Sequence, residues 1–162
     1  LRREDLPNLL ELKSESWETT HHVTIANMDD QNRWFESLDR DVHAPKNLIL
    51  TAFVDVTNIG IFKITNIDWV SRTADVAWDI FKQHRGHGFG KSLVAAGTSF
   101  CFKILHLHRL NCEILESNIP SQKCAETSGY CREGLKRESI LKGGIYVNSI
   151  VYGVLAIEFT GL

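Results

Sequence analysis

KQHRGHGFGKS, residues 82–92, is the stretch of sequence that decides the fold of this chain. The run ADVAWDIF at 74–81 mixes apolar and acidic side chains and predicts a β-strand before it, while 91–106 has apolar side chains at helical spacing and predicts a helix after it. Three alternating glycines in the loop between them let a ligand approach the bare backbone. The N–H groups at a helix start are unpaired and lie at the positive end of the helix dipole. The loop is therefore predicted to bind an anion, most naturally the pyrophosphate of a phosphorylated cofactor.

Composition limits the kind of protein this can be. A length of 162 residues suits one domain with a sizeable core, so we expect a single domain over residues 1–162. A net charge of -2 does not favour nucleic-acid binding, which depends on clustered Lys and Arg, and no apolar run reaches the roughly 20 residues that span a bilayer. Four cysteines without metal-ligand spacing predict buried thiols in a reducing compartment. We therefore expect a cytoplasmic protein that binds no metal, nucleic acid or membrane.

The order of predicted elements gives an α+β fold. The end of a strand at 1–3 comes first, and a helix that Asp5 caps, with Pro7 in its first turn, follows. A second helix begins after Asp29 or Asp30, and a hairpin of strands at 47–56 and 59–67 turns at Thr57-Asn58. The rest is predicted as follows: the strand and helix around the glycine loop, a strand at 109–115, a short helix between Pro120 and Gly129, and extended runs at 130–138 and 145–159.

Two other phosphate-binding motifs fit the loop less well. A P-loop, G-x-x-x-x-G-K-[ST], would end at Gly90-Lys91-Ser92, but its first glycine would fall on Arg85. A dinucleotide fold needs G-x-G-x-x-G in an opening βαβ unit, whereas this loop reads G-x-G-x-G and follows a hairpin.

A third motif fits closely. Residues 83–88, QHRGHG, match the pattern [QR]-x-x-G-x-[GA], and the chain thereby resembles the GNAT superfamily of N-acetyltransferases. Downstream, Asn118 to Ser121 and then 129–137 (GYCREGLKR) resemble the branch that acetylates the N-termini of ribosomal proteins, as do 34–38 (WFESL) and the closing strand with Tyr152. The resemblance implies a layered α/β/α fold with a mixed sheet of about six to seven strands and about four helices. It also implies that the strands at 74–81 and 109–115 splay apart.

The resemblance implies a binding site for acetyl-CoA, with no metal. Unpaired backbone near Ile80 is expected to hold the pantetheine arm, and N–H groups from Arg85 to Gly90 the pyrophosphate. Arg85 and Lys91 add positive charge for the phosphoribosyl end, or are ordinary solvated cations. Asn118 is expected to bind pantetheine, to cap a helix, or both. The implied cofactor residues are Ile80, Phe81, Gln83, Arg85, Gly86, His87, Gly88, Phe89, Gly90, Lys91, Asn118 and Ser121.

The expected reaction is direct attack of a neutral amine on the thioester. Ser121 is the expected proton donor to the leaving thiolate, or is only structural. Asp75 and Asp79 lie two pleats apart, hence on one face of their strand, and either is a candidate base or an ordinary surface aspartate. Glu138, just past the E-G-x-x-[KR] segment, is a further candidate. Ile140 stands where some members of the branch carry a proposed basic glutamate, so the chain departs from the family pattern there.

The acceptor is expected to meet the loop and helix near the start of the chain. His21 and His22 have a side chain suited to acid–base work but are more often incidental in a loop. Trp17 and Trp34 are candidates for the acceptor wall, with core packing as the alternative for Trp34.

Amine basicity ranks the acceptors. An α-amine of pKa about 7.8 is about one-seventh neutral at pH 7, whereas a lysine amine of pKa about 10.4 is neutral about once in 2,500 molecules. We therefore predict an acetyl-CoA-dependent N-acetyltransferase, monomer or homodimer, that acts on a protein N-terminal α-amine. The alternatives are a small-molecule amine (an amino sugar, amino acid or antibiotic) and an acyl-CoA-binding module without catalysis.

Overall fold

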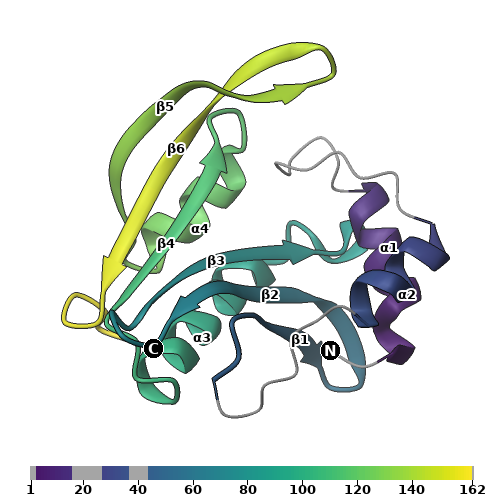
Figure 1. Ribbon diagram of the computed structural model, residues 1–162, viewed down its shortest axis with the longest axis horizontal. Helices are drawn as coiled ribbons and strands as arrows, with labels where there is room; N and C mark the ends of the chain where they lie inside the picture. The colour runs from purple at the N-terminus through teal and green to yellow at the C-terminus, as the bar shows by residue number, and fades with distance from the viewer. Residues whose placement is uncertain (1–2, 16–26, 37–43, 162) are drawn as a thin grey trace.

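The structure is a computed structural model that describes residues 3–15, 27–36 and 44–161. One six-stranded sheet runs through these residues in the order β1-β2-β3-β4-β6-β5 (Figure 1). The elements are a 3₁₀ helix at Arg3–Asp5, α1 Leu6–Glu15, α2 Met28–Glu36, β1 Leu48–Val54, β2 Thr57–Asp68, β3 Thr73–Ile80, a 3₁₀ helix at Lys82–His84, α3 Phe89–Lys103, β4 Arg109–Leu115, α4 Ile119–Thr127, β5 Cys131–Lys142 and β6 Ile145–Leu155. None of the described helices is long and apolar enough to cross a bilayer.

The sheet splits into two arms between β3 and β4. These strands are parallel, and they pair only at Thr73–Arg109, Ala74–Leu110 and Asp75–Asn111. Beyond Asp75, β3 stays paired with β2 up to Ile80, while β4 stays paired with β6 up to Leu115. Figure 1 shows the result as a V, with β1-β2-β3 in one arm and β4-β6-β5 in the other. The predicted splay is confirmed, and its open end is at the carboxyl ends of β3 and β4.

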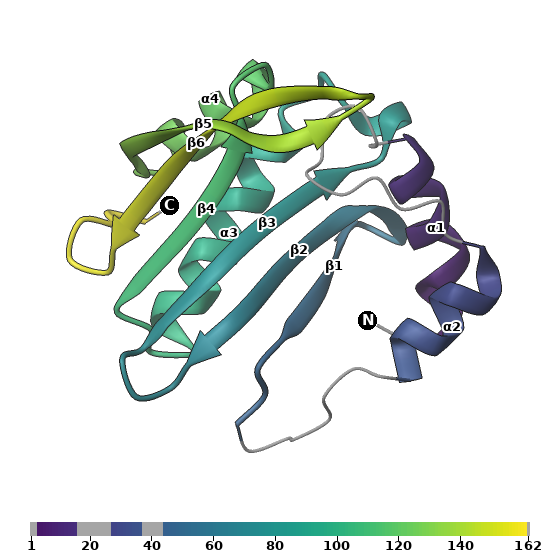
Figure 2. The same cartoon turned by 45° about the horizontal axis from the view of Figure 1, so that its top comes forward.

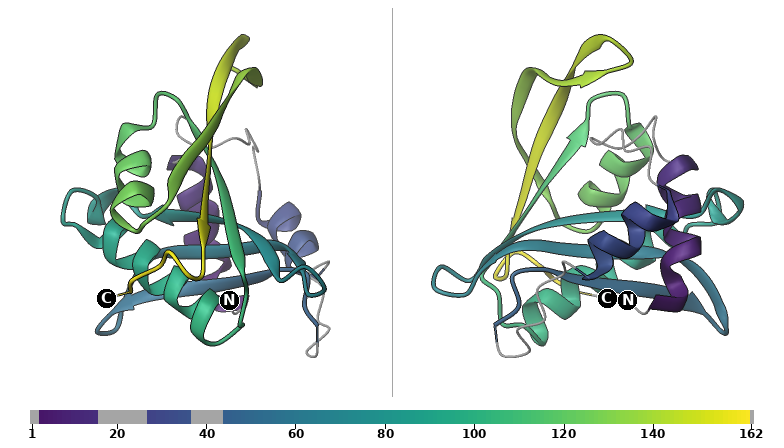
Figure 3. Two further views of the ribbon diagram at one scale, coloured as in Figure 1. Left: turned by 90° about the vertical axis from the view of Figure 1, so that its left-hand side faces the viewer. Right: turned by 45° about the vertical axis from the view of Figure 1, so that its right-hand side comes forward.

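Helices cover the two faces of the sheet unequally. α3 and α4 lie on one face, and α1 and α2 lie on the other, at the end of the arm that holds β1, β2 and β3 (Figures 2 and 3). The α3/α4 face holds the main core, in which apolar residues alternate along β3 and β4, including Val76 and Cys112. A smaller core under α1 and α2 joins Leu9 and Leu12 to Ile61 of β2 and to Phe81.

Close packing on the main core depends on a small residue in α3. A Cβ atom on Gly97 would lie 2.5 Å from the ring of Phe62, so only glycine lets the helix rest on that ring. Phe62 is fully buried and stacks on Trp78, with ring centroids 6.5 Å apart. The helix that begins at the glycine loop is thereby fixed directly against β2 and β3.

The sequence predicted most elements but misplaced some ends. The hairpin turn predicted at Thr57-Asn58 is wrong, because those residues begin β2 and the turn is formed by Asp55 and Val56. Asp55 has φ +53°, a conformation that aspartate tolerates better than most residues. The predicted strand end at 1–3 is not found at Arg3, which begins a 3₁₀ helix, and residues 1–2 lie outside the described residues.

Candidate cofactor and acceptor site

The glycine loop connects the end of β3 to the start of α3. Gly86 has φ +81° and Gly88 has φ +84°, the left-handed conformation in which other residues are strained. A Cβ atom built on either glycine would meet nothing within 4 Å, so the loop leaves open space beside its backbone. The side chains of Gln83 and Lys91 are exposed around it. The loop thus has the conformation and the room that the sequence predicted for an anion site.

Backbone donors gather in this loop. In the part of the chain that the structure describes, the N–H groups of residues 86–90 donate to no protein acceptor, and no side chain caps α3. His87 Nδ1 lies 2.9 Å from the carbonyl oxygen of Arg85, and the His87 ring stacks on Phe89. These contacts hold the loop in shape without covering its N–H groups. The arrangement is that of an anion-binding helix start.

The end of β3 presents backbone to the open side of the V. Phe81 N donates to Ile59 O, so the antiparallel ladder turns the polar groups of Ile80 the other way, towards the splay. The prediction of unpaired backbone needs a correction there, because Arg85 Nε donates to Ile80 O at 2.8 Å. The carbonyl is therefore already satisfied by Arg85, whose side chain was expected to add charge for the phosphoribosyl end or to be an ordinary solvated cation. Phe81 itself is buried in the smaller core, and its role towards a cofactor stays a prediction.

A second helix start lies at the carboxyl end of β4. Asn118 caps α4, because its side chain accepts from Ser121 N at 3.2 Å, and the predicted capping role is confirmed. Cys124 of α4 lies against the start of α3, with Sγ 3.1 Å from where a Cβ on Gly90 would be. Since β3 and β4 are parallel, the starts of α3 and α4 both lie at the open end of the V.

Burial disfavours the reactive thiolate at three of the four cysteines, Cys101, Cys112 and Cys124. Burial raises the pKa of the Cys101 thiol to about 12, and burial also raises the pKa of Cys124, against the charge of Lys91. Cys101 and Cys112 are buried free thiols as expected, whereas Cys131 is exposed, which corrects the prediction for that residue. Across the described ranges, no group of His, Cys, Asp or Glu side chains gathers to hold a metal ion.

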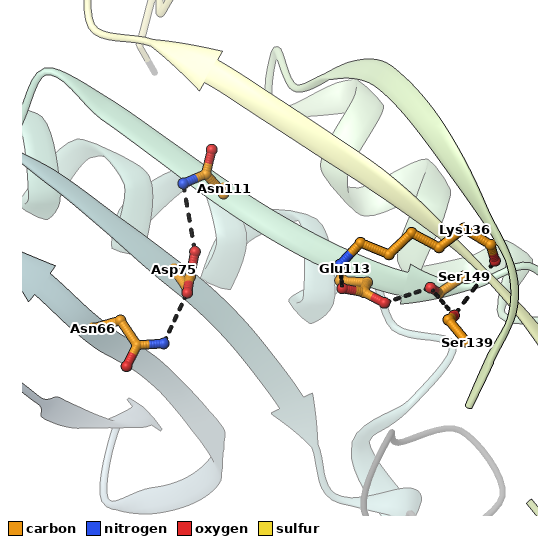
Figure 4. A network of polar contacts seen from close by, with 7 residues as sticks. All are labelled: Asn66, Asp75, Asn111, Glu113, Lys136, Ser139 and Ser149. Atoms are coloured by element: carbon orange, nitrogen blue, oxygen red, sulfur yellow. Dashed lines mark hydrogen bonds and ion pairs between the residues drawn. The ribbon is translucent and has the colours of Figure 1, made fainter. Parts of the chain in front are cut away.

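Asp75 and Asp79 share one face of β3, as the sequence predicted, and the structure shows that this is the face opposite α3. Their surroundings differ. Asp75 accepts from Asn66 Nδ2 at 2.9 Å and from Asn111 Nδ2 at 3.4 Å, so it links β2, β3 and β4 where the V is closed (Figure 4). Asp79 pairs with Lys63 at 3.4 Å, and its side chain is only 14% exposed. Asp75 therefore serves as a structural link, while Asp79 lies next to Ile80 near the open end.

The other candidates are spread around the fold. Glu138 has φ +50° in an irregular part of β5, where its N–H donates to Asn148. Trp34 packs against the smaller core, and Lys13 Nζ lies 4.8 Å from its ring centroid. Burial and the nearby charge of Lys63 lower the pKa of Lys13. The candidate acceptor residues Trp17, His21 and His22 lie outside the described residues.

Sequence reasoning missed one acidic residue on the face of the sheet away from α3. Glu113 of β4 lies on the same face as Asp75, with hydrogen bonds to Ser149 and Lys136 (Figure 4). The alternation in 109–115 (RLNCEIL) contained the signal, because Asn111 and Glu113 are its polar members between apolar neighbours.

A family model described as the acetyltransferase (GNAT) domain matches residues 1–130. The chain belongs to the GNAT acetyltransferase family. Its GNAT fold is matched by the crystal structure of the spermidine N-acetyltransferase from Vibrio cholerae in complex with CoA and spermine. The TM-score is 0.89 with 20% identity, over 98% of this chain and 94% of that one. The predicted superfamily and fold are therefore confirmed.

Curated relatives match this GNAT chain at low identity over part of their length. The spermidine N(1)-acetyltransferase of Vibrio cholerae is 27% identical over 88 residues, 54% of this chain and 51% of that protein. A putative ribosomal N-acetyltransferase of Bacillus subtilis is 26% identical over 102 residues, 63% of this chain and 56% of that protein. The chain spans a little over half the length of these relatives.

Proposed function

We propose that this protein is an acetyl-CoA-dependent N-acetyltransferase that acts on a small-molecule primary amine. The observation that carries the proposal is the set of backbone N–H groups at residues 86–90, which has open space beside it at the mouth of the V. Five consecutive donors at a helix start suit a pyrophosphate, which is the anion that joins the two halves of CoA. The thioester supplies the activated acetyl group, and the protein binds it and orients the amine against it.

The small-molecule acceptor replaces the protein N-terminus that the sequence favoured. Polyamine acetyltransferases occur both among the sequence relatives and among the similar folds. This supports a small-molecule amine, which the sequence analysis gave as an alternative, over a protein N-terminus as the acceptor.

The chemistry needs one group to take a proton and one to give it. The amine must lose a proton before its lone pair attacks the thioester carbonyl. Ser121, at the start of α4, is our candidate to protonate the departing thiolate, and its N–H is already fixed by the Asn118 cap. Asp79 remains a candidate for the proton acceptor on β3, and Glu138 is a less direct one.

A panel of amines tests the proposed function. The protein is mixed with acetyl-CoA and, in turn, spermidine, spermine, an amino sugar, an amino acid and peptides with free N-terminal alanine or serine, while free thiol is measured. We expect release with a small amine and little or none with the peptides. Release only with peptides would restore the N-terminal acceptor. CoA affinity by calorimetry without thiol release from any amine would instead support a binding module.

A further inference from the structure

A row of side-chain hydrogen bonds crosses the sheet at the closed end of the V. Asn66 Nδ2 of β2 donates to Asp75 Oδ2 of β3 at 2.9 Å, and Asn111 Nδ2 of β4 donates to Asp75 Oδ1 at 3.4 Å (Figure 4). Arg109 Nε, also of β4, donates to Asn111 Oδ1 at 2.7 Å, and the Arg109 guanidinium pairs with Glu133 of β5. These side chains, which we call the cross-sheet network, join β2, β3, β4 and β5.

A β-bulge directs the first side chain of the network to the right face. Ile64 and Ile67 both belong to the main core, so β2 has two residues between these core positions where regular alternation has one. The register of β2 against β3 shifts there, and Asn66 has φ +52°, which asparagine tolerates better than most residues. The bulge thus lets Asn66 reach Asp75 on the face away from the main core.

The last pair of the network also depends on local backbone features. The register of β5 against β6 shifts between Arg132 and Gly134, so Glu133 is the extra residue of a second bulge. Arg109 reaches Glu133 over Gly153 of β6, where a Cβ atom would lie 2.5 Å from Glu133 Oε1 and 2.6 Å from Arg109 Nη2. Because a side chain on β6 would displace this ion pair, the glycine allows the network to cross that strand.

The network lies at the point where the two arms of the V separate. Three residue pairs join β3 to β4, and Asp75–Asn111 is the last of them. The side chains of this last pair are the ones that bond to each other across the strands. Since α3 follows β3 and α4 follows β4, the spacing of the two helix starts depends on the angle between the arms at this pair.

Within the proposed function, on which this inference rests, we propose that the cross-sheet network sets the angle of the V and so its fit around CoA. Asp75 and Asn111 are its positioning residues. The diphosphate lies at the glycine loop on one arm, and the pantetheine arm runs between β3 and β4. From Asp75 to Ile80 the strand extends about 16 Å, so a rotation of about 5° at the closed end moves the open end by about 1.4 Å. A misplacement of that size is enough to weaken binding and catalysis.

The first test is Asp75→Asn. An amide at position 75 has one acceptor oxygen, whereas Asn66 and Asn111 both donate to this side chain, so one of the two bonds is lost. We expect the Kd for CoA, measured by calorimetry, to rise about tenfold. The Kd for 3′-phospho-ADP, the half of CoA that keeps the diphosphate but lacks pantetheine, is expected to stay within about twofold, because this ligand needs only the loop. Backbone hydrogen exchange at residues 73–75 and 109–111 is expected to become faster.

The second test exchanges the two side chains. In Asp75→Asn combined with Asn111→Asp, the amide at position 75 accepts from Asn66 and donates to the carboxylate at position 111, whose other oxygen accepts from Arg109. Every bond of the row is restored and the net charge is unchanged. We expect CoA affinity within about twofold of the unchanged protein, although each single substitution weakens it about tenfold. A role for the Asp75 carboxylate itself, as the sequence considered, would not be rescued, because position 75 then holds no carboxylate.

Two further variants serve as a second probe and a control. Asn66→Gly keeps the left-handed backbone of the bulge without strain and removes only the amide, and we expect the Kd for CoA to rise about three- to tenfold. Asp30→Asn removes the same charge from an exposed pair with Arg33 on α2, and CoA affinity is expected to be unchanged.

The following results overturn the inference. CoA affinity within about twofold of the unchanged protein in both Asp75→Asn and Asn66→Gly shows that the network does not set the site. An equal loss of affinity for CoA and 3′-phospho-ADP, or a double variant no better than its single variants, shows general damage rather than positioning. If the unchanged protein binds no CoA and releases no thiol with any amine, the proposed function fails and this inference fails with it. CoA binding by the unchanged protein together with unaffected variants rejects the inference alone.

Discussion

Gly88→Trp is expected to abolish measurable CoA binding, while Gly88→Ala retains most of it. Both variants place a Cβ atom at φ +84°, so both carry the same backbone strain, of order 1–3 kcal/mol. They differ in the bulk that enters the open space beside the loop. An indole ring there lies where a pyrophosphate would approach the N–H groups of residues 86–90. Calorimetry with CoA is expected to show at least about a 100-fold difference in Kd between the two, equivalent to about 2.7 kcal/mol.

The control for this pair lies in another glycine turn. Gly143, between β5 and β6, has φ +55° and open space around its Cβ position. Gly143→Trp therefore imposes a similar strain and a similar bulk far along the chain from the loop, and CoA binding is expected to be unaffected. Equal CoA affinity in Gly88→Trp and Gly88→Ala would show that the cofactor does not occupy the space beside residue 88. The loop would then lose its assigned role.

Gly60→Ala is expected to destabilise the fold and to weaken CoA binding together. A Cβ atom on Gly60 would lie 2.2 Å from the carbonyl oxygen of Asp79 and 3.1 Å from Ile80 Cα. These are backbone atoms in a paired strand, so they cannot rotate away as a flexible side chain could. We expect a loss of about 3 kcal/mol in the free energy of unfolding, measured in urea, because overpacking against backbone falls at the upper end of such costs. CoA affinity is expected to fall as well, since Ile80 directs its backbone into the splay.

Gly134→Ala provides the comparison within the same sheet. Gly134 also lies in a strand, β5, but a Cβ atom there meets nothing within 4 Å. Its free energy of unfolding is expected to change by less than about 0.5 kcal/mol, as for most open surface positions. A Gly60→Ala protein as stable as Gly134→Ala would mean that β2 and β3 can separate at this point without cost. The end of β3 would then not be fixed as the structure shows it.

Local chemistry explains what could be predicted from the sequence. Alternating glycines at 86, 88 and 90 before an apolar helix are enough to predict a loop with positive φ and an uncapped helix start. Asn118 before Pro120 is likewise enough to predict a capped helix. These features depend on residues only a few positions apart, so a short stretch of sequence is enough to predict them. The resemblance of 83–88 and 118–137 to GNAT motifs then gave the fold, because both blocks occur in the expected order.

Contacts between distant residues decided the rest. The end of β3 packs against Gly60, which is nineteen or more positions away in sequence. Nothing in the run 74–81 reveals that Asp79 and Ile80 need a neighbouring residue without a side chain. The sequence could not separate Asp75 from Asp79, because their difference comes from Asn66, Asn111 and Lys63 on other strands.

By itself, the sequence determined that this chain has a glycine loop before a helix and a capped second helix, since both follow from local conformational preference, and its resemblance to GNAT motifs implied the arrangement of strands. Only the tertiary structure decided where β3 and β4 part, and it placed Glu113 beside that gap, held by Ser149 and Lys136. The physical reason is that strand pairing joins β4 to β6 rather than continuing along β3. Such a choice is made by the energies of contacts between residues 30 or more positions apart, which no local pattern encodes.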